Sequence, residues 1–108
     1  MNIALLGPAL TYTDIACDKY LGIRKSVKKI YCRTIRDVIE LVSKGKVEKG
    51  IIPIENSIYG TVRETEDNLF RYHPRIAYSF TSKIHQNLVA KKDTDLKKIK
   101  IICSHQQA

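Results

Sequence analysis

The sequence lacks any long hydrophobic run: no apolar stretch approaches the roughly 20 residues that a membrane-spanning helix needs. The first apolar stretch, residues 2–6, is too short for the core of a signal peptide, and no basic segment precedes it. We therefore expect a cytoplasmic protein without a membrane partner. Hydrophobic residues make up 44% of the 108 residues, which is enough for the core of one modest domain and argues against disorder.

Cysteine is scarce as well. The three cysteines, Cys17, Cys32 and Cys103, lie far apart and form no Cys-x-x-Cys pair. This odd, scattered set argues against a disulfide framework and against a zinc site. We expect all three to be buried as small apolar residues, which is the usual state of free cysteine.

Acidic residues are outnumbered by basic ones, and the formal net charge is +8. Such a charge suits a nucleic acid, a membrane surface or a small anionic ligand. The lysines are dispersed around apolar segments, however, and the few aromatic residues do not alternate with them as on a base-stacking surface. We interpret the charge as solvated helix and strand flanks and expect no nucleic-acid partner. Nucleic-acid binding stays open as an alternative, with salt-dependent retention on DNA as its test.

Apolar segments alternate with helical patterns through residue 72. Strands are predicted at residues 2–6, 27–32 and 49–54. Pro53 cannot donate to a ladder, so the third strand should end there or lie at an edge of its sheet. A helix is predicted after each strand, with start signals at Thr11 or Thr13, at Thr34, and at Thr61, which has capping-box spacing to Glu64. The first helix should run to about Leu21, Gly45 should end the second, and His73-Pro74 should end the third. This alternation predicts an α/β fold with a parallel sheet.

The remaining third of the chain has a different pattern. Residues 75–90 favour an extended backbone, residues 93–98 a turn, and residues 99–103 another strand. Ser104-His105 then has the character of a helix start, but the sequence stops at residue 108. We therefore expect the chain to be a truncated piece of a longer protein.

Polar residues follow three of the predicted strands. In open α/β sheets, ligands bind beyond the carboxyl ends of the strands, where helix N-termini offer free N–H groups to anions. Three corners of this kind together predict an anion-binding rim with uncharged donors. They are residues 7–13, Glu55-Asn56-Ser57 with Gly60-Thr61, and Ser104-His105-Gln106.

The second corner carries a specific resemblance. Residues 50–57, Gly-Ile-Ile-Pro-Ile-Glu-Asn-Ser, are followed by Gly60 and by Thr65, Asp67 and Leu69. This order resembles the prephenate dehydratase family, which has Val/Ile-Pro-Ile/Val-Glu-Asn-Ser, then a glycine and a helix with Thr-x-Asp-x-Leu.

The other two corners extend the resemblance over residues 3–108. Gly7-Pro8 with Thr11-Tyr12-Thr13 is similar to the family's Gly-Pro-x-Gly-Thr-Phe/Tyr-Ser/Thr, and residues 104–108 resemble its Ser-His-Pro-Gln-Ala. Two positions depart from the pattern. Leu10 replaces a glycine, which should restrict positive φ in the first turn. Gln106 replaces a proline, which should loosen the start of the last helix.

The resemblance implies a type II periplasmic-binding-protein-like α/β fold. Residues 1–75 would form most of the first lobe and residues 76–108 the truncated start of the second, without an ACT regulatory domain. Members of the family convert prephenate to phenylpyruvate with loss of water and carbon dioxide, in phenylalanine biosynthesis and without a cofactor. The Thr-Arg-Phe motif to which the family's catalysis is attributed does not occur in this chain. The catalytic residues are therefore left unassigned, and we expect the chain to be inactive alone.

The resemblance also assigns the substrate contacts: Asn56, Ser57, Ser104 and Thr11. Each has a structural alternative, because Asn56 suits a turn, Ser57 a local cap, and the other two a helix N-cap. For Glu55 we expect a structural role, paired with a backbone amide or a basic residue. The alternative function is a non-catalytic binding module for a small dicarboxylate or an aromatic amino-acid-like ligand.

The second-lobe segment would leave apolar faces uncovered. Residues 76–90 and 99–103 would lack most of the helices that normally pack on such strands. Uncovered apolar strands tend to pair with another chain. We therefore expect a homo-oligomer.

Overall fold

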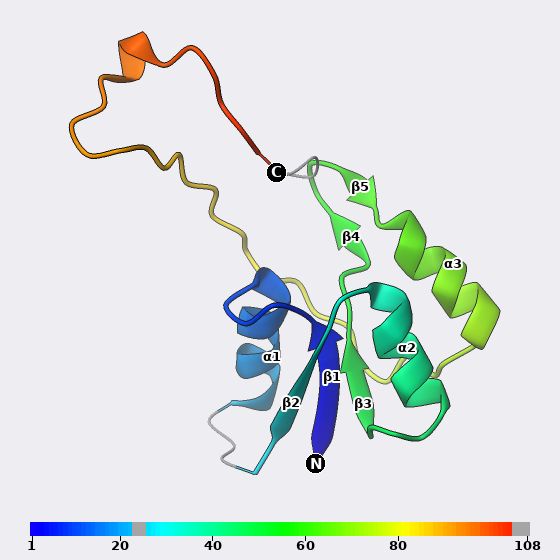
Figure 1. Ribbon diagram of the computed structural model, residues 1–108. Helices are drawn as coiled ribbons and strands as arrows, with labels where there is room; N and C mark the ends of the chain where they lie inside the picture. The colour runs from blue at the N-terminus through cyan, green and yellow to red at the C-terminus, as the bar shows by residue number, and fades with distance from the viewer. Residues whose placement is uncertain (23–25, 105–108) are drawn as a thin grey trace.

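The computed structural model describes residues 1–22 and 26–104 (Figure 1). A parallel sheet has the strand order β2-β1-β3, formed by β1 (Asn2–Leu6), β2 (Lys28–Cys32) and β3 (Lys49–Ile51). The central strand pairs on both sides, since Ala4 lies opposite Ile30 on β2 and opposite Gly50 on β3. The predicted α/β fold with a parallel sheet is confirmed. As expected from Pro53, β3 lies at an edge of this sheet and ends before the proline.

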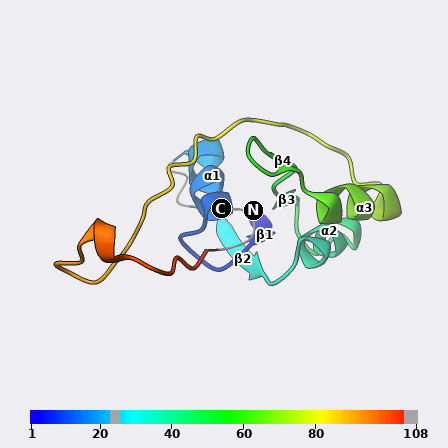
Figure 2. The same cartoon turned by 90° about the horizontal axis from the view of Figure 1, so that it is seen from above.

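The centre of β1 is buried on both faces of the sheet. On one face Ile3 and Leu5 pack against Cys17 and Leu21 of α1 (Tyr12–Leu21). On the other face Ala4 shares a core with Val38 of α2 (Ile35–Ser43). The helices thus cover opposite faces, as Figures 1 and 2 show. Burial on both faces explains why residues 2–6 are a nearly continuous apolar run.

The second helix begins and ends where the sequence predicts. The Thr34 side chain accepts a hydrogen bond from the Asp37 backbone N–H (3.1 Å), and the Asp37 carboxylate accepts one from the Thr34 backbone N–H (3.1 Å). This reciprocal pair satisfies two of the otherwise unpaired N–H groups of the helix start. Gly45, just beyond the last turn, has a φ of +64°, which glycine adopts without steric cost.

The third helix begins later than predicted. α3 spans Arg63–Tyr72 with Val62 at its N-cap, and no side chain caps it, so the predicted capping box of Thr61 and Glu64 is wrong. Thr61 instead belongs to β5 (Gly60–Thr61), which pairs antiparallel with β4 (Glu55–Asn56). The chain reverses here because Gly60 takes a φ of +87°. Helical periodicity could not reveal a hairpin with strands this short.

A polar cluster joins the end of α3 to α2. The Glu40 carboxylate accepts hydrogen bonds from Lys44, Tyr72 and Arg36. These three donors, Lys44 first, lower the pKa of Glu40 to about 2. Tyr72 is the last residue of α3, so the cluster fixes that end of the helix; beyond it His73 takes a left-handed conformation (φ +47°) and closes α3 as predicted.

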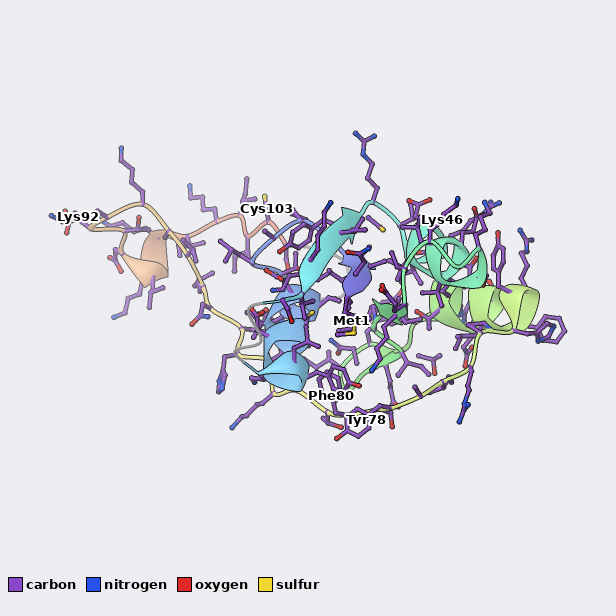
Figure 3. The ribbon with its side chains drawn as sticks, turned by 90° about the horizontal axis from the view of Figure 1, so that it is seen from below. Met1, Lys46, Tyr78, Phe80, Lys92 and Cys103 are labelled. Carbon is purple, nitrogen blue, oxygen red and sulfur yellow. The ribbon has the colours of Figure 1, made fainter. Side chains whose placement is uncertain are left out.

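The segment after α3 runs alongside the sheet to α1 and then projects from the body (Figure 2). Tyr20 of α1 stacks on Phe80, with 5.9 Å between ring centroids, and lies 5.3 Å from Tyr78 (Figure 3). The Tyr12 hydroxyl donates to the His85 carbonyl (3.1 Å). Residues 76–85 are thereby tied to α1, whereas Lys92 lies at the far tip of the projecting part (Figure 3).

The predicted strand at residues 99–103 does not form. The projecting part holds a short 3-10 helix, Leu96–Lys98, at the predicted turn, and the backbone on either side of it is irregular within the described range. A strand needs a neighbour for its N–H and C=O groups, and no strand lies beside these residues in the described part of the chain. Cys103 is consequently exposed, so the prediction that all three cysteines are buried holds only for Cys17 and Cys32. None of the described helices is long and apolar enough to cross a membrane.

Candidate functional site

The candidate site lies at the carboxyl-terminal edge of the parallel sheet. β1 and β3 are adjacent and parallel, so the turn after β1 and the turn after β3 both emerge at this edge, drawn uppermost in Figure 1. The first turn carries Thr11 and leads into α1, while the second leads into the β4–β5 hairpin with Asn56 and Ser57. The fold thus places three of the four candidate residues at one edge of the sheet.

Asn56 holds the tip of the hairpin. Its side-chain Oδ1 accepts hydrogen bonds from the backbone N–H groups of Ile58 (2.8 Å) and Tyr59 (3.2 Å). Its Nδ2 group and the hydroxyl of Ser57, which is exposed, have no hydrogen-bond partner among the described residues. Asn56 therefore serves as the turn residue of its structural alternative and still presents an uncharged N–H donor beside an uncharged O–H donor.

A side chain of α3 holds the start of the hairpin in place. Thr65, fully buried in the first turns of that helix, donates its hydroxyl hydrogen to the Pro53 carbonyl (Oγ1 to O, 2.5 Å). Because Pro53 precedes the hairpin directly, this bond fixes where the chain leaves the sheet. The Glu55 side chain is exposed and has no ion pair or hydrogen bond among the described residues, so the structural pairing expected for it is not observed there.

The first turn is built differently from its prediction. Thr11 occupies the N-cap position of α1, but its hydroxyl points back to the Leu6 carbonyl (3.4 Å) and does not cap the helix. Leu10 takes a φ of +68°, so the turn adopts the left-handed conformation even though a leucine replaces the glycine. The Leu10 backbone N–H donates to the Asp14 carboxylate (2.8 Å), which holds the left-handed conformation in place.

Asp14 is the centre of a buried polar cluster. Only 6% of the residue is exposed, and its Oδ1 accepts hydrogen bonds from Lys29 Nζ (2.6 Å) and the Tyr31 hydroxyl (3.0 Å). Lys29 also pairs with Asp18 (2.6 Å). The hydrogen bond from Lys29 is the main reason why the pKa of Asp14 lies below its usual value despite burial. Burial, followed by the neighbouring Asp14, raises the pKa of Tyr31.

Two hollows flank the candidate edge. A largely apolar cavity of about 360 Å³ lies between α1, the turn after β3 and the segment after α3; it is lined by Tyr12, Tyr20, Ile54, Glu55, Tyr78 and Phe80, among others. A second, polar hollow lies on the other side of the hairpin and is lined by Arg33, Thr34, Thr61, Arg63 and Glu64. Glu55 borders the first hollow and Thr61 the second, and the two residues pair across the hairpin. The hairpin therefore separates the two hollows.

The prephenate dehydratase family model matches residues 3–108 of the chain. The chain belongs to the prephenate dehydratase family. It is 39% identical, over 94% of its length, to the prephenate dehydratase of Methanocaldococcus jannaschii. It is 35% identical, over its full length, to that of Lactococcus lactis subsp. cremoris, and 33% identical, over 98%, to a bifunctional chorismate mutase/prephenate dehydratase of Buchnera aphidicola.

A solved structure agrees with this family assignment. The X-ray structure of prephenate dehydratase from Streptococcus mutans matches with a TM-score of 0.59 and 34% sequence identity, over 65% of this chain and 35% of that one. The chain spans 36%, 37% and 28% of the three relatives named above, in that order. The predicted family membership is confirmed, and the chain corresponds to about a third of such an enzyme.

The third corner of the prephenate dehydratase pattern is described only at its first residue. Ser104 is exposed and lines neither of the two hollows, while His105 and Gln106 lie outside the described residues. In the described ranges, no group of three His, Cys, Asp or Glu side chains could hold a metal ion.

The sequence did not predict two residues that hold this edge of the sheet in place, Asp14 and Thr65. Asp14 has no predicted role in the site, and Thr65 enters only as part of the family motif. Two features of the sequence could have indicated this role for Asp14. It lies four positions after Leu10, and Lys29 and Tyr31, a basic and a phenolic side chain, alternate on the next strand. Such a pairing needs the register of β1 and β2, which the sequence alone does not give.

Replacing Thr65 by valine is expected to lower the free energy of unfolding by about 1 kcal/mol, because the Pro53 carbonyl loses its partner in a buried setting while the side-chain volume is kept. Amide exchange at Asn56–Tyr59 should rise more than exchange in β1. Thr65→Ser retains the hydroxyl and is the control. Equal exchange at the hairpin in both variants would show that the hydroxyl does not anchor it.

Proposed function

We propose that this chain forms the N-terminal part of a prephenate dehydratase and supplies one wall of its prephenate site. The observation that carries the proposal is the β4–β5 hairpin, which presents the uncharged donors of Asn56 and Ser57 at the carboxyl-terminal edge of the sheet. Prephenate carries two carboxylates, and fixed N–H and O–H donors near helix N-termini suit such anions. Thr11, in the first turn at the same edge, would contribute a further donor by exchanging its hydrogen bond to the Leu6 carbonyl for one to the substrate.

The wall belongs to a two-lobed site in this proposal. Residues 1–75 would form most of the first lobe of a type II periplasmic-binding-protein-like fold, and residues 76–108 would begin the second. The departure of the chain from the first sheet after residue 85, and its lack of strand partners among the described residues, fit a segment that continues into another unit. Ser104 would then face the substrate from that second lobe.

The reaction defines what this wall can and cannot do. Prephenate loses carbon dioxide and its ring hydroxyl, and formation of the aromatic ring drives the step. Donors on the hairpin would orient the carboxylates, and the apolar lining of the neighbouring cavity would keep water out. Departure of the hydroxyl needs a positioned proton donor. The resemblance attributes the family's catalysis to the Thr-Arg-Phe segment. Because this sequence contains no such segment, we propose that the 108-residue chain is inactive alone.

A pair of proteins tests the proposal. The purified 108-residue chain, mixed with prephenate, should yield no phenylpyruvate by absorbance. A hybrid in which these residues replace the matching third of the Methanocaldococcus jannaschii enzyme should yield it, because the remaining two thirds would complete the site. The unmodified relative is the control for folding and turnover. A folded hybrid that fails to turn over prephenate would refute the assignment, and prephenate binding by the chain alone beside an inert hybrid would favour the non-catalytic binding module.

Self-association is the remaining part of the proposal. Apolar side chains of the segment after α3 are largely exposed, with Val89 at 85%, Ile101 at 81% and Ile102 at 67%. Exposed apolar surface of this kind promotes pairing between copies. We propose a homo-oligomer, which sedimentation velocity of the chain would reveal.

A further inference from the structure

The first turn of the site contains a residue in an unfavourable backbone conformation. Leu10 has a φ of +68°, and its side chain is 88% exposed, so packing of that side chain does not hold the backbone there. A left-handed conformation is unfavourable for a residue with a Cβ, because the Cβ comes too close to the following carbonyl oxygen. Something else in the molecule must therefore hold Leu10.

Asp14 is the group that holds it. The Leu10 backbone N–H donates to Asp14 Oδ2 at 2.8 Å, while Oδ1 of the same carboxylate is held by Lys29 and Tyr31 of β2. A carboxylate bound at one oxygen by a neighbouring strand cannot swing away, so the other oxygen is a fixed acceptor for the turn. The first turn is thus attached to the sheet through Asp14.

Tyr31 supports the same turn by packing. A Cβ placed on Gly7 would lie 2.9 Å from the Tyr31 Cβ, so the turn passes directly over this side chain. The Gly7 backbone N–H also donates to the Cys32 carbonyl (2.9 Å). The Gly7 end of the turn is therefore held directly by the carboxyl end of β2, and the Leu10 end is held through Asp14.

We propose that Asp14 is a positioning residue for prephenate binding, which holds the first turn in its binding shape where Leu10 stands in place of a glycine. This inference rests on the proposed function, since the turn's role is to present Thr11 to the substrate. Glycine takes positive φ freely, so a turn with glycine at position 10 would not depend on the carboxylate. Asp14 thus compensates for one specific residue of this chain.

The contact itself is tested in the 108-residue chain by amide exchange. Asp14→Ala should raise exchange at the Leu10 amide about tenfold or more beyond any rise at Ala4 in the central strand, because the only acceptor found for that N–H among the described residues is lost. Asp14→Asn has a single acceptor oxygen, which Lys29 and Tyr31 would occupy, so it should expose the Leu10 amide as Asp14→Ala does. Asp18→Ala removes the other partner of Lys29, leaves both Asp14 oxygens in place and should keep Leu10 protected. Unchanged exchange at Leu10 in Asp14→Ala, or an equal rise in Asp18→Ala, would overturn the contact.

The functional part is tested in the hybrid enzyme by a double-mutant cycle. Asp14→Ala should raise the KM for prephenate by roughly an order of magnitude when residue 10 is leucine. In the Leu10→Gly background the same change should raise KM much less. A purely structural role would instead lower the unfolding midpoint equally in both backgrounds and leave KM unchanged, which would overturn the proposal.

The two tests separate this inference from the proposed function. An inert hybrid with normal residues at positions 10 and 14 would refute the proposed function, and the role in substrate binding with it, whatever the amide exchange shows. An active hybrid in which Asp14→Ala has the same effect on KM in both backgrounds would refute only the role of Asp14. If Asp14→Ala prevents folding, Asp14→Asn and Leu10→Gly still measure whether KM depends on the pair.

Discussion

Lys29→Met is expected to lower the free energy of unfolding by about 3 kcal/mol at neutral pH, because it leaves a buried carboxylate without its cation. Asp14 is 6% exposed, and Lys29 is its nearest donor at 2.6 Å. The Tyr31 hydroxyl and the Leu10 N–H would remain as hydrogen-bond donors. They do not carry a full positive charge, so they offset only part of the cost of burying the carboxylate. Urea unfolding of the chain would measure the difference.

The pH dependence of this loss has a defined sign. Lys29 lowers the pKa of Asp14 in the folded chain. The pair therefore contributes its full stability above the pKa of an unfolded aspartate, about 3.9. That stability is lost as the pH falls through the lower pKa that Asp14 has in the folded chain. In Lys29→Met, burial is no longer countered by the cation, and the pKa of Asp14 should rise. Protonation then relieves the buried charge, so the stability gap between the variant and the normal chain should narrow as pH falls below about 4.

Two variants make the result specific to the Asp14 pair. Lys28 is exposed and adjacent on the same strand, so Lys28→Met removes the same charge without uncovering Asp14 and should change stability by less than about 0.5 kcal/mol. Adding Asp14→Asn to Lys29→Met should recover part of the loss, since the uncompensated charge is gone. Equal effects of the Lys28 and Lys29 substitutions would contradict the account.

The sequence predicted the layered part of this fold because each signal there is local. Alternating apolar segments and the Thr34 cap set the strands and α2, and these need no knowledge of distant residues. The sequence did not reveal the β4–β5 hairpin, and it predicted too early a start for α3. Thr61 has the spacing to Glu64 that is typical of a helix cap, but it pairs with Glu55 in the hairpin. That pairing depends on a turn at Gly60, whose φ is set by how the chain reverses and not by residue periodicity.

For the site, the order of the motifs predicted which edge of the sheet carries the candidate residues, but not the side chains that hold those residues in place. The resemblance assigned Asn56, Ser57 and Thr11, which lie at one edge because β1 and β3 are parallel neighbours. It could not show that Asn56 closes its own turn or that Asp14 fixes Leu10, because both depend on side-chain distances across the fold. The strand predicted at residues 99–103 was wrong for a related reason. Apolar residues favour a strand, but they do not indicate whether a neighbouring strand is present to pair with it.

Asn56→Asp is expected to lower kcat/KM of the hybrid enzyme by about a hundredfold or more while leaving the hairpin intact, because a negative charge would face the prephenate carboxylates. Aspartate can accept the same hydrogen bonds from Ile58 and Tyr59, so the turn survives. What changes is the N–H donor, which becomes a charged acceptor. The substitution thus separates the two roles of Asn56, turn residue and substrate donor. Steady-state kinetics with prephenate, with amide exchange at Ile58 and Tyr59, would measure both.

Asn56→Ala and Asn2→Asp complete this experiment. Asn56→Ala removes the acceptor as well, so it should expose the Ile58 and Tyr59 amides to exchange in addition to reducing turnover. Asn2→Asp makes the same charge change at the amino end of β1, on the opposite edge of the sheet, and should leave kcat/KM within a few-fold of normal. Full activity of Asn56→Asp with a protected turn would reduce Asn56 to a turn residue. Loss of activity in the two Asn56 variants but not in Asn2→Asp would identify the hairpin as the wall that contacts the substrate carboxylates.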